Sequence, residues 1–400
     1  MATLDIPASS GRLNTSPGNW ETPSTFSIQE KIEVYEPDLT ELELKYVVDC
    51  MKTGWISGIG EYVKQFEKEF SAFCDVSYGI ATCNGTVALE LALATLKVGP
   101  GDEVIAPNLT FAATANAICH LGAQPIFVDS DPQTWTIDPN RIEEAITPKT
   151  KAIIVVHLYG HPANMDPIMQ IAYDHGLFVI EDAAEAHGAL YKKRRVGSIG
   201  HMACFSFYGN KIITTGEGGM VVTNNPGLAE RARFLRGQAM TRDNYYWHPE
   251  VGYNFRMTNL QAAIGVAQLK RIHHLIKAKR NLAKRYSSAL ERIPGIITPP
   301  EADWATNVFW MYSILIRPEV TGTTRDEVRR FLLSRNIQTR PFFFPMSTLP
   351  PYIGASARRK YPVSERLAMQ GLSLPSSPKL SQQKIDRIVK TLQEALEKKS

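Results

Sequence analysis

A glycine-rich segment near the middle of the chain reads Phe205-Ser206-Phe207-Tyr208-Gly209-Asn210-Lys211-Ile212-Ile213-Thr214-Thr215-Gly216-Glu217-Gly218-Gly219. Lys211 follows Ser206 by five positions, and both lie among aromatic residues at the end of an apolar run. A lysine amine forms a Schiff base with an aldehyde cofactor, and a serine hydroxyl beside it can hold a phosphate group. A surface position is the ordinary interpretation of any single lysine, but this spacing favours a pyridoxal phosphate site.

A second informative segment lies upstream and reads Val179-Ile180-Glu181-Asp182-Ala183-Ala184-Glu185-Ala186-His187-Gly188. Its apolar run is typical of a buried strand and ends at two carboxylates. Pyridoxal phosphate needs a carboxylate opposite its ring nitrogen, because the negative charge keeps the pyridinium protonated. We prefer Asp182 for this role, with Glu181 as the alternative and a helix N-cap or turn as the ordinary interpretation. His187 is a candidate ligand contact, although a lone histidine is more often structural.

Two further segments offer groups for the same cofactor. Cys83-Asn84-Gly85-Thr86 directly precedes a predicted helix, whose free N–H groups and dipole favour an anion. Gly85 lets a phosphate approach and Thr86 adds a hydroxyl, although an ordinary N-cap explains the same residues. Phe111 follows a predicted strand, where ligands of open α/β sheets bind, and it can stack on the pyridine ring or simply fill the core.

Strand and helix patterns alternate from the capping box at Thr40–Glu43 to about residue 225. The predicted helices are 86–97 and 166–175, and the predicted strands are 102–106, 152–158, 177–181 and 220–223. This alternation predicts an α/β fold with a mostly parallel sheet covered by helices. A long helical stretch follows, from about Leu260 to Leu290. Beyond it we predict a strand at Tyr312–Ile316, a helix opening at Thr324, and an amphipathic C-terminal helix.

We expect three parts along the chain. Residues 1–30 are rich in Ser, Pro, Thr and Gly, which predicts a flexible extension. Residues 31–265 are expected to form a large cofactor-binding domain, and residues 266–400 a smaller C-terminal α+β domain.

Composition excludes several classes of partner. The chain has 400 residues, 44% of them apolar, and a formal net charge of +4 that is scattered along the sequence. We therefore expect no nucleic acid partner, and the run Lys192-Lys193-Arg194-Arg195 is interpreted as a solvated turn. No apolar run approaches the length of a membrane span. The cysteines lack metal-ligand spacing, so we expect no metal site and mostly buried, reduced thiols in a cytoplasmic protein.

Taken together, these motifs resemble the sugar aminotransferases of the DegT/DnrJ/EryC1/StrS family. The resemblance spans about residues 32–395 and rests on the segments around Asp182 and Lys211. It also includes Gly237-Gln238-Ala239-Met240, Tyr246-Trp247 and Val251-Gly252-Tyr253-Asn254-Phe255-Arg256-Met257-Thr258-Asn259. Within the family, these residues are similar to the subgroup that makes GDP-perosamine, with Glu185 where many relatives carry glutamine. One departure is that Phe344 and Ser347 stand where the family often has histidines.

The resemblance implies an aspartate-aminotransferase-like fold (fold type I), a large domain plus a smaller C-terminal one, and a homodimer with active sites at the subunit interface. Lys211 would bind the cofactor and shuttle protons, Asp182 would pair with the ring nitrogen, and Phe111 would stack on the ring. Glu185 would lie near the ring hydroxyl. The phosphate would be held by Gly85, Thr86, Ser206 and, from the other subunit, Asn254. The residues expected to border the substrate are Trp55, Ser57, His187 and Arg256.

The resemblance further implies transfer of an amino group from L-glutamate to a nucleotide-linked 4-keto-6-deoxy sugar, with GDP-4-keto-6-deoxy-D-mannose as the leading candidate. A dTDP- or UDP-linked keto sugar, aminated at C3 or C4, is the main alternative. A sugar 3-dehydratase of the same fold replaces the lysine with histidine, so Lys211 argues against it. A non-catalytic regulator that keeps the fold is a third alternative, which the intact Lys211, Asp182 and Ser206 disfavour.

Overall fold

The central sheet of the protein has seven strands in the order β1-β9-β8-β5-β4-β2-β3. The neighbours β8-β5, β5-β4, β4-β2 and β2-β3 run parallel, whereas β9 is antiparallel to both β1 and β8. The predicted mostly parallel α/β sheet is therefore confirmed. The strands are β1 Tyr78–Thr82, β2 Glu103–Pro107, β3 Gln124–Val128, β4 Thr150–Val156, β5 Phe178–Asp182, β8 Met202–Ser206 and β9 Gly219–Thr223.

The computed structural model describes residues 30–241, 243–356 and 359–397. The predicted N-terminal extension, apart from Glu30, lies outside these residues. The described residues from Lys31 onward form one compact unit.

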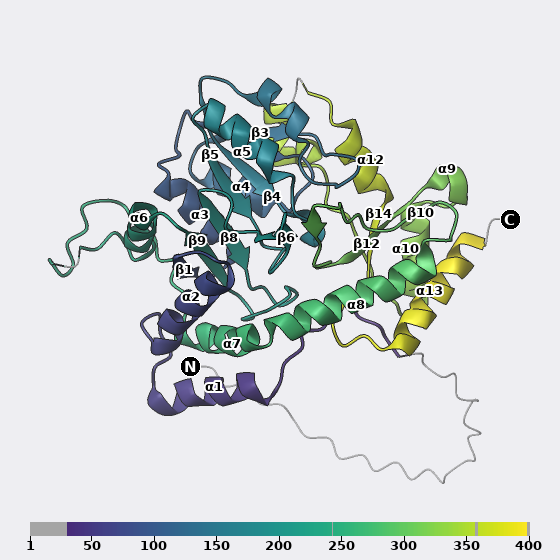
Figure 1. The fold of residues 1–400 in the computed structure, drawn as a ribbon, viewed down its shortest axis with the longest axis horizontal. Helices are drawn as coiled ribbons and strands as arrows, with labels where there is room; N and C mark the ends of the chain where they lie inside the picture. Colours follow the sequence, from purple (N-terminus) through teal and green to yellow (C-terminus); the bar gives the residue numbers. More distant parts are fainter. Residues whose placement is uncertain (1–29, 242, 357–358, 398–400) are drawn as a thin grey trace, which may run out of the picture. The chain divides into compact units, whose positions relative to one another are not determined.

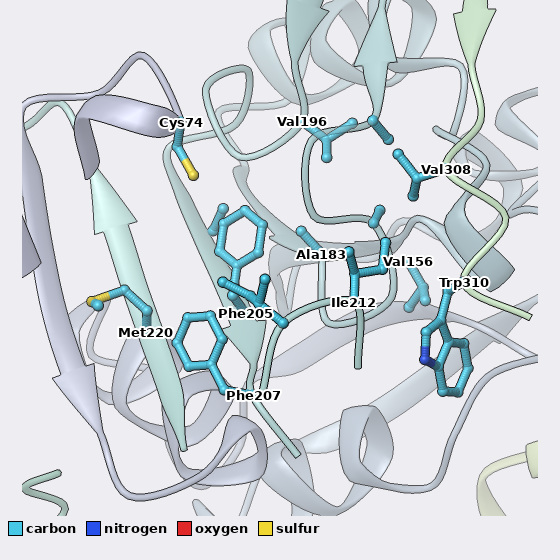
Figure 2. Packing of buried hydrophobic residues seen from close by; sticks show 14 of the residues in the cluster. Cys74, Val156, Ala183, Val196, Phe205, Phe207, Ile212, Met220, Val308 and Trp310 are labelled. Atoms are coloured by element: carbon cyan, nitrogen blue, oxygen red, sulfur yellow. The ribbon is translucent and has the colours of Figure 1, made fainter. Parts of the chain in front are cut away.

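Helices cover both faces of the central sheet, because alternate strand residues carry apolar side chains to each face. One face packs against α3 (Gly85–Thr95), α4 (Ala113–His120) and α6 (Pro226–Arg236). The other packs against α2 (Glu61–Phe73), α5 (Met165–Asp174) and α7 (Asn259–Lys270). Figure 2 shows the second face around Phe205 and Phe207 of the β8 segment and, further along the same cluster, Trp310.

Capping boxes fix the starts of three of the helices that the structure describes. Thr40 opens α1 (Glu41–Thr53), Thr258 opens α7, and Thr324 opens α10 (Arg325–Ser334), so the boxes predicted at Thr40 and Thr324 are confirmed. Gly54 ends α1 in the left-handed conformation, with φ of 76°.

The stretch predicted as one long helix from about Leu260 to Leu290 is two helices, α7 and α8 (Ile272–Leu290). The helical path breaks at Arg271, where φ is −107° and ψ is 2°. The guanidinium of Arg271 donates to the Asp38 carboxylate at 2.7 Å, which ties the break to the segment before α1. Figure 1 shows α8 continuing from α7 toward the C-terminal elements.

A smaller sheet of four strands, β10-β12-β14-β13, forms beyond α8. It packs with α8, α10 and α13 (Gln382–Glu397) around a separate apolar core. Its strands are β10 Ile296–Ile297, β12 Tyr312–Ile316, β13 Arg340–Pro341 and β14 Gly371–Leu374. The predicted strand at 312–316 and the amphipathic C-terminal helix are confirmed. The predicted domain boundary at 265–266 falls inside α7, and the division into two domains stays a prediction.

The remaining elements are short. A three-stranded sheet joins β11 (Ala305–Thr306) to the hairpin of β6 (Leu190–Tyr191) and β7 (Arg194–Arg195). The turn predicted over Lys192–Arg195 is confirmed for Lys192 and Lys193, which are exposed and have positive φ, whereas Arg194 and Arg195 form the strand β7. The other helices are α9 Pro318–Thr321, α11 Ile353–Ser356 and α12 Pro362–Gln370.

Phe70 of α2 ties this helix to the central sheet, because its buried ring contacts those of Phe205 and Phe207 at 4.9 and 5.0 Å. We expect Phe70→Ala to lower the free energy of unfolding by about 3–5 kcal/mol, through lost burial and the cavity left behind. Urea unfolding measures this. Tyr173→Ala, at a side chain 83% exposed on α5, is the control and should change stability by less than about 0.5 kcal/mol. Equal losses in both variants would contradict the packing role.

Candidate active site

Five chain segments meet at one edge of the central sheet. The strands β2, β4, β5 and β8 are mutually parallel, and β1 shares their direction because β9 is antiparallel to both β1 and β8. Their carboxyl ends therefore lie along the same edge, which is where ligands of open α/β sheets bind. The residues at or just after these ends are Gly85, Phe111, Tyr159, Asp182 and Ser206.

The N-terminus of α3 lies against the end of β8. The Asn84 side chain caps the helix by accepting from the Val87 N–H at 3.0 Å. The N–H groups of Gly85 and Thr86 are the first of the helix and therefore have no acceptor within it. A Cβ added at Gly85 would lie 2.7 Å from Cβ of Ser206. Glycine is therefore required for this approach, which combines a helix N-terminus with a serine hydroxyl as an anion site requires.

The two adjacent carboxylates at the end of β5 have different surroundings. Glu181 accepts hydrogen bonds from the N–H groups of Gly197, Ile199 and Gly200 at 2.6–2.8 Å, and its Oε2 lies 3.0 Å from Nε2 of His157. Burial acts to raise the pKa of Glu181, but these hydrogen bonds outweigh it and hold the pKa below its usual value. Both oxygens of Glu181 are thus engaged in joining β5 to the 197–200 turn.

Asp182 is also buried but has fewer partners. Its Oδ2 accepts from the Thr114 hydroxyl at 2.9 Å and its Oδ1 from the Ala184 N–H at 3.2 Å. Burial raises the pKa of Asp182, against the lowering effect of these hydrogen bonds. Of the two carboxylates, Asp182 retains the greater capacity for a further cationic partner.

Lys211 lies in the loop after β8, with its side chain 11% exposed. Its Nζ is 3.9 Å from Oε1 of Glu185 and 3.9 Å from the centre of the Trp310 ring. Burial lowers the pKa of Lys211, while the charges of Glu185 and Asp182 oppose this shift. The result is an amine that loses its proton more easily than a surface lysine and stays close to two carboxylates.

Glu185 is held on the other side by the main chain. Its Oε2 accepts from the Tyr159 N–H at 2.7 Å. Burial raises the pKa of Glu185 to about 7, against the lowering charge of Lys211. Tyr159 itself has φ of 53°, an uncommon conformation for a non-glycine residue, and the Glu185 carboxylate helps to hold it.

A series of aromatic rings extends from Trp310, whose ring lies beside the Lys211 amine. Tyr159 stacks on Trp310 at 6.3 Å and on Phe343 at 5.5 Å, and Phe343 contacts Phe111 at 5.6 Å. The Phe111 ring is 58% exposed, which leaves it free to stack on a planar ligand. Sequence reasoning missed Tyr159 and Trp310. Tyr159 follows a predicted strand and could have been found there, whereas Trp310 comes from a distant loop without a local signal.

His187 is completely buried between the rings of Phe70, Phe205 and Phe207, 5.4–6.3 Å away. Its ring nitrogens make no hydrogen bond to a described residue, and burial lowers its pKa to about 3. This neutral, enclosed imidazole favours the structural role that the sequence left open. Contact between His187 and a substrate stays a prediction.

Four other candidates lie around the end of β1. Arg256 is bridged to Thr82 and Asn254 to Gly237, so this segment crosses the strand end within one chain. Arg256 also lies beside the loop after α1, since a Cβ at Gly58 would come within 3.1 Å of its Cβ. The side chains of Trp55, Ser57 and Asn254 are exposed. Their predicted contacts with substrate or phosphate need a ligand or a second subunit to be tested.

The segment that departs from the family pattern adjoins the site. Ser347 N–H donates to Oδ1 of Asn108 at 2.8 Å, and Met346 N–H donates to the Asn108 main-chain oxygen. Phe344 is 66% exposed. Its side chain therefore faces outward near the segment that carries Phe111.

These residues fit pyridoxal phosphate. The Gly85–Ser206 approach suits the phosphate, the buried Asp182 suits a cationic ring nitrogen, and Lys211 supplies a buried amine in the loop that follows Ser206. Over the described ranges, no group of three or more His, Cys, Asp or Glu side chains is arranged to hold a metal ion. No helix in the same ranges has the length and apolar character needed to cross a membrane.

Comparison with known proteins gives a consistent result. Residues 37–393 match the DegT/DnrJ/EryC1/StrS aminotransferase family. The chain is 47% identical to a GDP-perosamine synthase of Caulobacter vibrioides, over 92% of this chain and 98% of that protein. It is 46% identical to a GDP-perosamine synthase of Escherichia coli O157:H7, over 91% and 98%.

Solved structures agree. DesV of S. venezuelae has a TM-score of 0.83 at 37% identity, covering 90% of this chain and 95% of DesV. Spr1654 from Streptococcus pneumoniae, solved in its PLP form, has a TM-score of 0.86 at 28% identity, covering 92% of this chain and 99% of Spr1654. The chain therefore belongs to the DegT/DnrJ/EryC1/StrS aminotransferase family and is a pyridoxal phosphate-dependent aminotransferase.

Proposed function

We propose that this enzyme transfers an amino group from L-glutamate to C4 of GDP-4-keto-6-deoxy-D-mannose. The observation that carries the proposal is the buried Lys211 amine, 3.9 Å from Glu185, at the sheet edge where Asp182 and Ser206 end their strands. The choice of sugar is supported by 46–47% identity to two GDP-perosamine synthases across nearly the whole chain.

This chain's residues would hold the cofactor at its phosphate, its ring nitrogen, its ring face and its ring hydroxyl. The N–H groups of Gly85 and Thr86 and the hydroxyl of Ser206 would bind the phosphate, joined by Asn254 of the partner subunit. The Asp182 carboxylate, oriented by Thr114, would keep a proton on the ring nitrogen. Phe111 would stack on the ring, and Glu185 would lie near the ring hydroxyl. When bound at Lys211, the cofactor would supply an electron sink for charge that develops on the donor's α-carbon.

Lys211 moves the protons. With glutamate bound, its amine would take the proton from the α-carbon of the donor and carry it during the transfer of the amino group. The pKa of Lys211, lowered by burial, keeps part of the amine neutral and able to act as a base. In the half-reaction with the sugar, the same amine would deliver a proton to C4 of the sugar. Trp55, Ser57 and Arg256 border the sugar nucleotide.

Two subunits share each active site in this proposal. The first helix and the loop after it carry exposed apolar side chains of the kind that protein interfaces bury: Leu44, Val48, Met51, Trp55, Ile56 and Ile59. A second copy of the chain is the proposed partner. The five free cysteines support a reducing compartment such as the cytoplasm.

The substrate is tested by a half-reaction. Protein converted to its aminated cofactor form with glutamate, then freed of donor, is mixed with GDP-, dTDP- and UDP-linked keto sugars while cofactor absorbance is followed. We expect fast recovery only with GDP-4-keto-6-deoxy-D-mannose. Lys211→Ala should abolish turnover, whereas Lys193→Ala, in the exposed hairpin turn, should not change it. Preferred recovery with a dTDP- or UDP-linked sugar would replace the proposed substrate, and full activity of Lys211→Ala would refute the mechanism.

Replacing Asp182 should mainly affect catalysis, whereas replacing Glu181 should mainly affect stability. Asp182→Asn is expected to lower kcat about 10²-fold at nearly unchanged stability, because it removes the charge opposite the ring nitrogen. Glu181→Gln is expected to lower the free energy of unfolding by about 1–3 kcal/mol, because it loses charge-assisted hydrogen bonds to the 197–200 turn. Kinetics and urea unfolding of both variants measure the contrast. The reverse pattern would make Glu181 the ring partner.

Glu181 also makes the free energy of unfolding depend on pH, in a direction that its pKa shift determines. Its pKa is lower in the folded protein than its ordinary value of 4.5, so its stabilising effect is present above that pH. The effect is lost as the pH falls through the lowered folded value. The stability difference between wild type and Glu181→Gln should therefore shrink in acid, and a difference that grows in acid would contradict the account.

Met51→Glu tests the shared site. A charge on the apolar face of α1 should convert the dimer to a monomer in analytical ultracentrifugation and reduce activity per chain, because Asn254 of the partner subunit is lost. Lys45→Glu introduces the same residue at an exposed polar position of the helix and is the control. A monomeric wild-type enzyme with full activity would refute the proposal.

A further inference from the structure

Lys279 is a buried lysine that the proposed reaction does not use. It lies on α8, its side chain is 1% exposed, and its ammonium donates to the main-chain oxygen of Trp310 at 2.7 Å and to that of Ser376. Among the residues that the structure describes, no carboxylate forms an ion pair with it. Burial lowers the pKa of Lys279 to about 7. Burying a lysine without a carboxylate partner costs free energy, which its two hydrogen bonds to main-chain oxygens offset in part.

Two of the neighbours of Lys279, Trp310 and Tyr35, contact the loop that carries Lys211. The indole N–H of Trp310 donates to the main-chain oxygen of Asn210 at 2.7 Å, and its ring lies 3.9 Å from the Lys211 amine. The hydroxyl of Tyr35 donates to the main-chain oxygen of Lys211 at 2.7 Å. The Lys279 ammonium is 5.2 Å from the Tyr35 ring centre and thus lies next to both residues.

The loop that carries Trp310 is strained and needs to be held. Phe309, immediately before it, has φ of 50°, which is uncommon for a residue with a side chain. Its N–H donates to Oδ1 of Asn307 at 2.7 Å, and a Cβ added at Gly160 would come within 2.9 Å of the Phe309 and Trp310 nitrogens. Lys279 holds the loop at its next residue, on the carbonyl of Trp310.

We propose that Lys279 is a positioning residue for Lys211. By fixing the Trp310 carbonyl and packing against Tyr35, it keeps the Lys211 amine in its enclosed place between Trp310 and Glu185. The proposal rests on the proposed role of Lys211 as the proton carrier. It joins α8 and the C-terminal segment around Ser376 to the chemistry at the sheet edge.

The test compares Lys279→Met, Lys279→Arg and the control Lys277→Met, an exposed lysine of the same helix. The pKa of the Lys211 amine is measured in the cofactor-free protein by trace labelling with acetic anhydride across pH, with mass spectrometry of the Lys211 peptide. In Lys279→Met we expect that pKa to rise toward the ordinary value of a solvated lysine. In the holoenzyme we expect kcat to fall about tenfold or more with little change in the KM for glutamate.

In Lys279→Arg, the Lys211 pKa and kcat should lie closer to the wild-type values, because the variant keeps the charge and the hydrogen-bond donors. Lys277→Met should match wild type. An unchanged Lys211 pKa and kcat in folded Lys279→Met, or equal changes in Lys277→Met, would overturn the proposal. If Lys279→Met does not fold, Tyr35→Phe replaces it and must raise the Lys211 pKa, because it removes only the hydroxyl that holds the Lys211 carbonyl. An unchanged pKa in Tyr35→Phe would likewise overturn the proposal.

Labelling of the cofactor-free protein separates this inference from the proposed function. A shifted Lys211 pKa in an enzyme that aminates no sugar would keep Lys279 as a positioning residue and reject the reaction. If the enzyme aminates the sugar but the Lys211 pKa does not shift in Lys279→Met, the reaction is supported and the positioning role of Lys279 is rejected.

Discussion

The active site depends on the burial of one amine, that of Lys211. Lys211 must be buried enough to lose its proton and close enough to a carboxylate to remain stable in the fold. Its Nζ meets both demands, with Glu185 at 3.9 Å and the Trp310 ring at 3.9 Å. Burial alone would favour the neutral amine and a carboxylate alone the charged one, so their balance keeps the proton mobile. Neither group is near Lys211 in sequence, so the whole fold is needed to bring the three together.

The other residues of the site come together at the sheet edge, because parallel strands bring their carboxyl ends to one side. Asp182 and Ser206 are the last residues of β5 and β8, and Gly85 and Phe111 come shortly after β1 and β2, so local geometry brings all four to that side. The strained residues Tyr159 and Phe309 lie where the central sheet meets the loop from the C-terminal part. Glu185 holds the first through its N–H, and Asn307 holds the second. Strain of this kind persists only where neighbouring contacts fix it.

Local signals in the sequence were enough for the parts of the fold that depend on local physics. The capping boxes at Thr40 and Thr324 and the strands β2, β4, β5, β9 and β12 were predicted, because each is set by a few adjacent side chains. Of the run predicted as a turn, only Lys192–Lys193 is the turn, and Arg194–Arg195 is the strand β7. The break at Arg271, where the guanidinium contacts Asp38 far away in the chain, was not predicted. Trp310, Tyr35 and Lys279 were also not predicted. Their importance comes from contacts with the Lys211 loop that no periodicity or spacing reports.

The central claim is that Lys211 is the lysine that carries the cofactor. Reduction of the holoenzyme with borohydride, followed by digestion and mass spectrometry, identifies the modified lysine directly. The account predicts the cofactor on Lys211 alone. Lys279, also buried, is the internal reference and should stay unmodified, because its ammonium is bound to main-chain oxygens behind Trp310. A cofactor on Lys279 or on any other lysine would contradict the assignment of the active site.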